Sequence, residues 1–149
     1  MSIWVYGFFD NPNHPPAEKE LEALLSIHQS CRPGEMVEIR LTDRRDPPGK
    51  GARPGDVFIF LVRHKGKRCV RGRAVVGAPC RFGTASPWMR GLYGAGDRKR
   101  HWLPFSEFEL HAHREPAILG LRDSDLPNPS GQAFIKRQRE TDHLAPELR

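Results

Sequence analysis

The sequence has few cysteines and no long hydrophobic run. Its three cysteines, Cys31, Cys69 and Cys80, are odd in number and widely spaced, which predicts neither a disulfide framework nor a zinc motif. No stretch approaches the roughly 20 apolar residues of a transmembrane helix, and residues 1–10 lack the charged region, apolar core and cleavage site of a signal peptide. We therefore expect a cytoplasmic protein that has reduced cysteines and no membrane partner.

The sequence also lacks the short motifs of nucleotide-processing enzymes. It contains no Gly-rich phosphate loop of the Walker kind and no dinucleotide fingerprint. His28 with Cys31, and His111 with His113, have spacings from which a metal site across the fold is conceivable. A capping or surface histidine and a packed thiol account for the same residues. We therefore expect no catalytic residue, no metal and no cofactor.

The length and the turn-forming residues indicate one domain of short elements. The chain has 149 residues, 38% of them hydrophobic, with 14 prolines and 14 glycines. This length is sufficient for one ordinary hydrophobic core, and the many turn formers argue against a helical bundle. We expect a single domain over residues 1–149, without internal repeats.

Hydrophobic periodicity predicts one helix and several strands. Alternation or unbroken apolar runs predict strands at 3–9, 37–41, 57–62, 70–76 and 102–110. Helical spacing predicts a helix at 17–27 and a short helix or turn at 118–126, and a hairpin is expected at Lys65-Gly66. Residues 43–54 are expected to be a mobile insert, and residues 128–149 an arm of uncertain structure. This order predicts an α+β domain whose mostly antiparallel sheet curls into a small β-barrel with flanking helices.

Positive charge is concentrated in the middle of the chain. The net charge is +6, yet residues 63–100 contain eleven Lys or Arg and one acid, so the rest of the chain is net acidic. Solubility does not require this segregation, whereas a polyanionic partner explains it. Within the basic segment, the Gly-rich and aromatic stretch 79–97 is longer than most connections, which is typical of a functional loop.

The region from Pro54 to Ala117 resembles the EVE domain, a relative of the YTH and ASCH domains in the PUA-like superfamily. The resemblance rests on the turn Arg53-Pro54-Gly55-Asp56, the strand Val70 to Val76, Tyr93, the run Arg100-His101-Trp102, and the stretch Glu115 to Leu119. It implies a small barrel with a pocket for a nucleobase, often a modified one, presented by DNA or RNA. It also implies that the module recognises and does not catalyse.

A flipped base needs aromatic faces, and its backbone needs cations. The candidate base-pocket residues are Trp88, Tyr93, Trp102 and Trp4. The candidate phosphate-binding residues are Arg71, Arg73, Arg81, Arg90, Arg98, Lys99 and Arg100. Ordinary core packing for the tryptophans and a solvated surface for the cations are the competing interpretations.

The sequence thus favours a nucleic-acid reader module, with an effector protein as a possible further partner. Two alternatives stay open. One is a small nucleoside-related hydrolase of the ASCH type, for which Lys99, Thr84 and Glu107 are candidates by analogy of fold alone. The other is a protein-interaction module whose basic patch meets an acidic partner.

Overall fold

The computed structural model describes residues 1–8, 16–41, 45–93, 98–127 and 135–148. Its strands are β1 (Ile3–Phe8), β2 (Val37–Arg40), β3 (Val57–His64), β4 (Lys67–Val76), β5 (Arg81–Gly83), β6 (Arg100–Arg114) and β7 (Ile135–Arg137). Its α-helices are α1 (Ala17–Ser30) and α2 (Arg90–Tyr93), and its 3-10 turns are η1 (Pro87–Met89), η2 (Pro116–Leu119), η3 (Asp123–Asp125) and η4 (Pro146–Leu148). The chain is therefore an α+β protein, as the sequence predicts.

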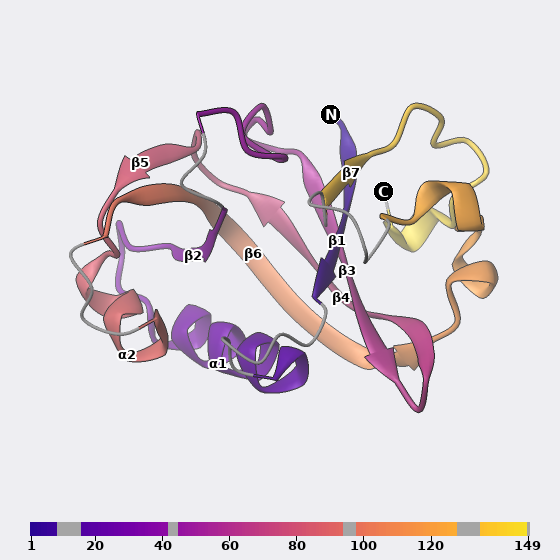
Figure 1. Cartoon of the computed structure of the whole chain (residues 1–149), viewed down its shortest axis with the longest axis horizontal. Coiled ribbons are helices and arrows are strands. Elements are labelled where there is room, and N and C mark those ends of the chain that lie inside the picture. Colours follow the sequence, from indigo (N-terminus) through magenta and orange to yellow (C-terminus); the bar gives the residue numbers. More distant parts are fainter. Residues whose placement is uncertain (9–15, 42–44, 94–97, 128–134, 149) are drawn as a thin grey trace.

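The strands form one sheet in the order β2-β6-β4-β3-β1-β7, and β5 pairs with the first residues of β6. Only β1 and β3 run parallel; the other pairs are antiparallel. The long strand β6 arcs across the sheet, with α1 and α2 lying below it in Figure 1. The sheet is open in the described part of the chain and is not closed into the expected barrel. The two end strands, β2 and β7, each pair with only one other strand among the described residues, so the sheet keeps two open edges.

Alternation along the buried strands produces two apolar cores. Phe58 and Phe60 of β3 contribute to the larger core, together with Trp4 of β1 and with Leu21 of α1. Ile59 of β3 contributes to the smaller core on the opposite face. Because both faces of β3 are covered, its sequence is an unbroken apolar run and not an alternating one.

The C-terminal segment covers the smaller core. Leu119 lies beside Leu144 and Leu148 there, and these side chains pack against Ile3 and Val5 of β1. Part of the arm of uncertain structure is therefore an ordered layer, in which β7 pairs with β1. Residues 128–134 and 149 of that arm lie outside the described residues.

The structure confirms the predicted hairpin and adds detail to two other predicted segments. Lys65 and Gly66 both have positive φ, as a tight hairpin turn between β3 and β4 requires. The stretch 118–126, expected as a short helix or turn, contains the end of η2 and the whole of η3, two 3-10 turns divided by Gly120 at φ 82°. In the segment 43–54, which is expected to be a mobile insert, backbone hydrogen bonds form turns from Pro47 onward. Residues 43 and 44 lie outside the described residues. No helix in the described ranges is long and apolar enough to span a membrane.

Candidate functional site

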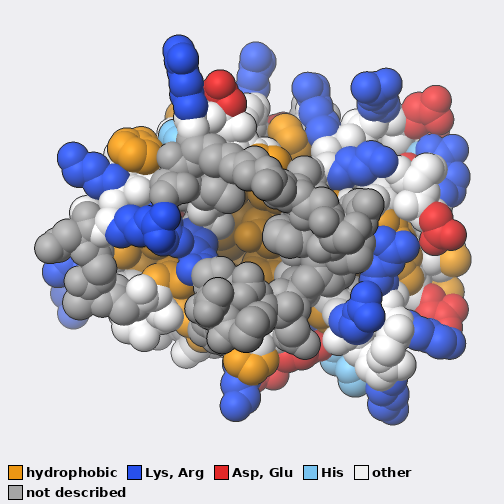
Figure 2. Space-filling view, in the orientation of Figure 1, with side chains coloured by type: hydrophobic (Ala, Val, Ile, Leu, Met, Phe, Trp, Pro, Cys, Tyr) orange, Lys and Arg blue, Asp and Glu red, His pale blue; other side chains and the backbone are white. Residues whose placement is uncertain are grey.

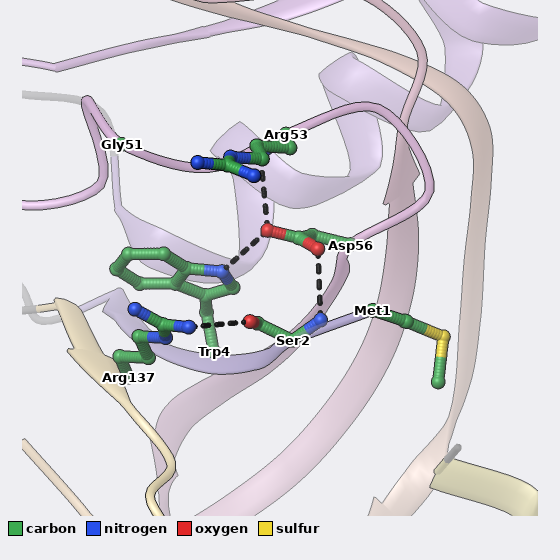
Figure 3. A pocket seen from close by; sticks show the side chains of 7 residues that line it. All are labelled: Met1, Ser2, Trp4, Gly51, Arg53, Asp56 and Arg137. Atoms are coloured by element: carbon green, nitrogen blue, oxygen red, sulfur yellow. Dashed lines mark hydrogen bonds between the residues drawn. The ribbon is translucent and has the colours of Figure 1, made fainter.

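A pocket opens where β1 and β3 begin. It has a volume of about 420 Å³ and is lined by Met1, Ser2, Trp4, Gly51, Arg53, Asp56 and Arg137. The parallel register places Ile3 beside Val57, so the residues just before β3 lie next to the first residues of β1. Pairing of β7 with β1 places Arg137 opposite Trp4. Three segments distant in sequence therefore contribute to one wall (Figure 3).

Asp56 connects two of these segments, the first residues of the chain and the turn before β3, by hydrogen bonds. Its carboxylate accepts hydrogen bonds from the backbone N–H of Ser2 at 2.8 Å, from the backbone N–H of Arg53 at 2.9 Å and from the indole of Trp4 at 3.1 Å. Burial raises the pKa of Asp56, but these three donors outweigh burial and hold the pKa below its ordinary value. Asp56 is therefore an ionised structural anchor whose oxygens are already occupied.

Two arginines project beside the Trp4 ring. The Arg137 guanidinium lies 5.8 Å from the ring centroid and donates a hydrogen bond to Ser2 Oγ at 3.0 Å. Figure 3 shows the Arg53 guanidinium on the other side of the pocket. Among the described residues, neither guanidinium has a carboxylate partner, and both side chains are exposed. The pocket consequently presents two guanidiniums without ion-pair partners among the described residues next to an aromatic ring, with Asp56 as the one acid in its lining.

The arginines that sequence reasoning assigned to phosphates are differently placed. Arg71 bonds Glu18 at 3.0 Å and Arg73 bonds Glu109 at 3.3 Å. Arg71 also donates a short hydrogen bond to the carbonyl oxygen of His111. Each guanidinium is thus neutralised by a carboxylate from another element, which weakens its attraction for an outside anion.

Arg81 is held more tightly still. Its Nε and Nη2 donate to the two carboxylate oxygens of Glu38 at 2.6 and 2.8 Å, and Ser86 Oγ donates to the same carboxylate. Glu38 is only 3% exposed, and the hydrogen bonds to Glu38 raise the pKa of Arg81. This bidentate pair fastens β5 and the turn before η1 to β2.

Of the other predicted phosphate contacts, Arg90 begins α2, and Arg98, Lys99 and Arg100 lead into β6. Arg90, Arg98 and Lys99 are exposed, while Arg100 is half-buried. Arg98 and Arg100 make interactions within the protein. These four positions stay predictions, and none of them is among the residues that line the Trp4 pocket.

The four predicted base-pocket aromatics are divided between separate places. Tyr93 and Trp102 lie together, with ring centroids 5.5 Å apart. Trp102 is buried and donates its indole N–H to the carbonyl of Gly83. Trp88 donates to the carbonyl of Met36 at 2.7 Å, whereas Trp4 belongs to the pocket at the start of β1. The structure therefore joins two of the four.

A polar cluster adjoins Tyr93. Arg40, the register partner of Trp102, places its guanidinium 4.7 Å from the Tyr93 ring centroid and 3.7 Å from a carboxylate oxygen of Glu20. Burial raises the pKa of Glu20, with Arg40 opposing the rise. Burial, aided by Glu20, also raises the pKa of Tyr93. The Tyr93 hydroxyl is buried and has no hydrogen-bond partner among the described residues.

One face of the sheet carries the aromatic side chains of the larger core. Lys and Arg side chains project around the periphery of the view in Figure 2. The larger core provides a row of phenylalanines on its face of the sheet, Phe58, Phe60, Phe105 and Phe108, in mostly edge-on contact. All four side chains are buried, so they belong to the core.

The residues proposed by analogy with ASCH hydrolases do not converge. Thr84 and Lys99 directly flank the last β5–β6 pair, Gly83 with Arg100. Glu107 is exposed in the middle of β6 and pairs with Val75. It lies eight positions along the chain from Lys99, on the order of 25 Å of extended backbone.

Sequence reasoning missed the two pocket arginines and the polar cluster. Arg53 stands in the Arg53-Pro54-Gly55-Asp56 turn, which was noticed only as a part of the resemblance. Arg137 has no local signal, because its role depends on a β1–β7 pairing across most of the chain. Glu20 and Arg40 look like ordinary surface charges, and only their burial distinguishes them.

The sequence and the structure of this protein can be compared with those of known proteins. Comparison with models of protein families, with curated protein sequences and with solved structures finds no match for this chain. The resemblance to the EVE domain and the reader function therefore stay predictions. The assignment of function rests on the geometry alone.

Proposed function

We propose that this protein binds nucleic acid and that the Trp4 pocket receives one nucleotide of the strand. The observation that carries the proposal is the pair of exposed guanidiniums, Arg53 and Arg137, which lie beside an aromatic ring and have no carboxylate partner among the described residues. Guanidiniums match phosphate oxygens bidentately. Their charge also agrees in sign with the net charge of +6 of the whole chain.

The parts of a nucleotide have distinct partners in this pocket. A phosphate suits Arg53, whose guanidinium is unpaired among the described residues. Trp4 is 9% exposed and stacks on Phe58 with ring centroids 5.7 Å apart, so it offers only a limited surface. The planar Arg137 guanidinium covers that surface and serves as the stacking plane for a base. A volume of about 420 Å³ lies within the range of ligand pockets.

A titration of pocket variants with fluorescent oligonucleotides tests this proposal. Single-stranded and double-stranded DNA and RNA, with and without modified cytosine or adenine, are titrated at two salt concentrations. We expect Arg53→Ala and Arg137→Ala each to weaken binding about tenfold at low salt. Each change should also reduce the slope of log affinity against log salt by about 0.7 to 0.9, because one phosphate contact is lost.

Arg63→Ala is the matched control. Arg63 is an exposed arginine near the other end of β3, about 23 Å of extended strand from Asp56. The substitution removes the same charge and should change affinity less than twofold. Equal weakening by Arg63→Ala would indicate diffuse attraction to net charge, and full binding by both pocket variants would overturn the assignment of the pocket.

The polar cluster at Tyr93 supports a second candidate function, the binding of a free planar ligand such as a nucleoside. Its specific observation is the buried Tyr93 hydroxyl without a partner among the described residues, next to Arg40 and Glu20. A buried polar group of this kind is unfavourable unless a ligand or water completes its hydrogen bonds. Binding of free nucleosides that Tyr93→Phe abolishes, with no dependence on Arg53, would favour this candidate over the first.

A further inference from the structure

Three side chains from distant parts of the sequence meet near the hairpin end of the sheet. Glu18 lies in the first turn of α1, His64 ends β3, and His113 lies near the end of β6. One carboxylate oxygen and two imidazole nitrogens, one from each residue, all lie within 4.8 Å of one another. The three side chains are half-buried, so the group is accessible from solvent.

The contacts within this cluster leave one histidine without a hydrogen-bond partner among the described residues. The His113 Nε2 is in short contact with a carboxylate oxygen of Glu18. The His64 ring stacks on the His113 ring, with centroids 3.8 Å apart and planes at 10°. No described residue forms a hydrogen bond with the His64 ring, although it is half-buried. A half-buried imidazole without a hydrogen-bond partner is suited to accept a metal ion.

We propose that Glu18, His64 and His113 bind a divalent transition-metal ion, with zinc as the best match. Two imidazoles and one carboxylate are a common set of protein ligands for zinc. Neutral imidazole prefers zinc, copper or nickel over magnesium and calcium. Ligand atoms at zinc distances in a tetrahedron are about 3.3 Å apart. To admit an ion, the stacked imidazoles must turn toward a common point, and His113 Nε2 must move away from the Glu18 oxygen that it contacts.

Arg71 supports the site from outside. Its Nε donates to the other carboxylate oxygen of Glu18 at 3.0 Å, and another of its nitrogens donates to the carbonyl of His111. Glu18 is therefore held between α1, β4 and β6, and its other oxygen, which contacts His113 Nε2, faces the proposed site. Such outer contacts orient the ligating carboxylate. Three protein ligands leave one tetrahedral position for water or a small anion.

The test is metal binding by untagged, metal-stripped protein. Zn²⁺ is titrated by calorimetry, and Co²⁺ serves as a spectroscopic probe whose visible absorption reports tetrahedral coordination. We expect one ion per chain with a Kd of about 1 µM or tighter. At 100 times the Kd, zinc should raise the free energy of unfolding by about 2.7 kcal/mol. A Kd weaker than about 100 µM, or a Co²⁺ spectrum typical of octahedral coordination by water, would overturn the proposal.

Single substitutions assign the ligands. His64→Ala and His113→Ala should each weaken zinc binding at least 100-fold, and Glu18→Gln about tenfold or more. His28→Ala is the matched control, since His28 lies on α1 near its other end and packs against Phe108; it should leave binding unchanged. Urea unfolding of the metal-free variants confirms that they fold. Unchanged binding in folded His64→Ala and His113→Ala protein would place the ion elsewhere and refute this site.

Discussion

The Trp4 pocket and the basic middle of the sequence differ in how their arginines are compensated. In the segment from residue 63 to 100, Arg71, Arg73 and Arg81 each pair with a glutamate from another element. At the pocket, Arg53 and Arg137 have no carboxylate partner among the described residues. The segment richest in positive charge is thus the one in which three arginines are internally neutralised.

This difference shows why a count of charges along the chain does not locate an anion site. The acids that neutralise arginines of the middle segment are Glu18, Glu38 and Glu109. They belong to α1, β2 and the later part of β6, and all three lie outside residues 63–100. A guanidinium in an ion pair has exchanged its water for a carboxylate and attracts a phosphate less strongly. Unpaired arginines are therefore the better indicators of a binding surface.

The largest expected effect comes from removing a partner inside the middle segment. Glu38→Ala deprives Arg81 of a bidentate partner that is 3% exposed, and we expect the free energy of unfolding to fall by about 3 kcal/mol. Urea unfolding monitored by tryptophan fluorescence measures it. Glu109→Ala is the control, because the Glu109 side chain is 50% exposed, whereas that of Glu38 is buried. The Arg73–Glu109 pair should contribute less than about 1 kcal/mol. Similar losses for both would contradict the distinction between buried and exposed pairs.

The next effect concerns the anchor of the pocket and depends on pH. The pKa of Asp56 is lower in the folded protein than in the unfolded chain, so the stability that it contributes is complete above its unfolded pKa and is lost as the pH falls through its folded pKa. Asp56→Asn should therefore lower stability by about 2 kcal/mol at neutral pH. Urea unfolding at neutral pH and below about pH 3 should show the gap closing. A gap that is constant with pH would contradict the ionised anchor.

A smaller effect separates the two groups of arginines in binding. Arg73→Ala removes an arginine already paired with Glu109, so we expect less than a twofold change in oligonucleotide affinity. Arg53→Ala should produce about a tenfold loss under the same conditions. The two variants are compared in one anisotropy titration at low salt. A larger loss for Arg73→Ala would return the phosphate contacts to β4, as the sequence suggested.

The smallest expected effect concerns the uncharged hydroxyl group of Tyr93. Tyr93→Phe removes a hydroxyl that is buried and has no partner among the described residues, so its loss should leave stability unchanged or raise it by up to about 1 kcal/mol. Thermal unfolding by circular dichroism measures the difference. A loss above about 1 kcal/mol would show that the hydroxyl has a partner that the described residues do not include.

The sequence by itself determined the elements that local patterns encode. The apolar run of β3, the helical spacing of α1 and the Lys65-Gly66 turn all have signals confined to a few neighbouring residues. It also predicted the α+β class and the chemistry to search for, cations beside aromatic rings. Tyr93 and Trp102 lie together as expected, although the sequence did not identify Arg40 and Glu20 beside them.

The tertiary structure decided which charges are paired and which are free. Arg137 reaches Trp4 only because β7 pairs with β1, and Glu18 reaches His64 and His113 only because α1 packs beside the ends of β3 and β6. The open edge of the sheet was likewise set by long-range strand pairing. Such contacts depend on where the chain returns in space, whereas periodicity and composition report only on the immediate neighbours of a residue.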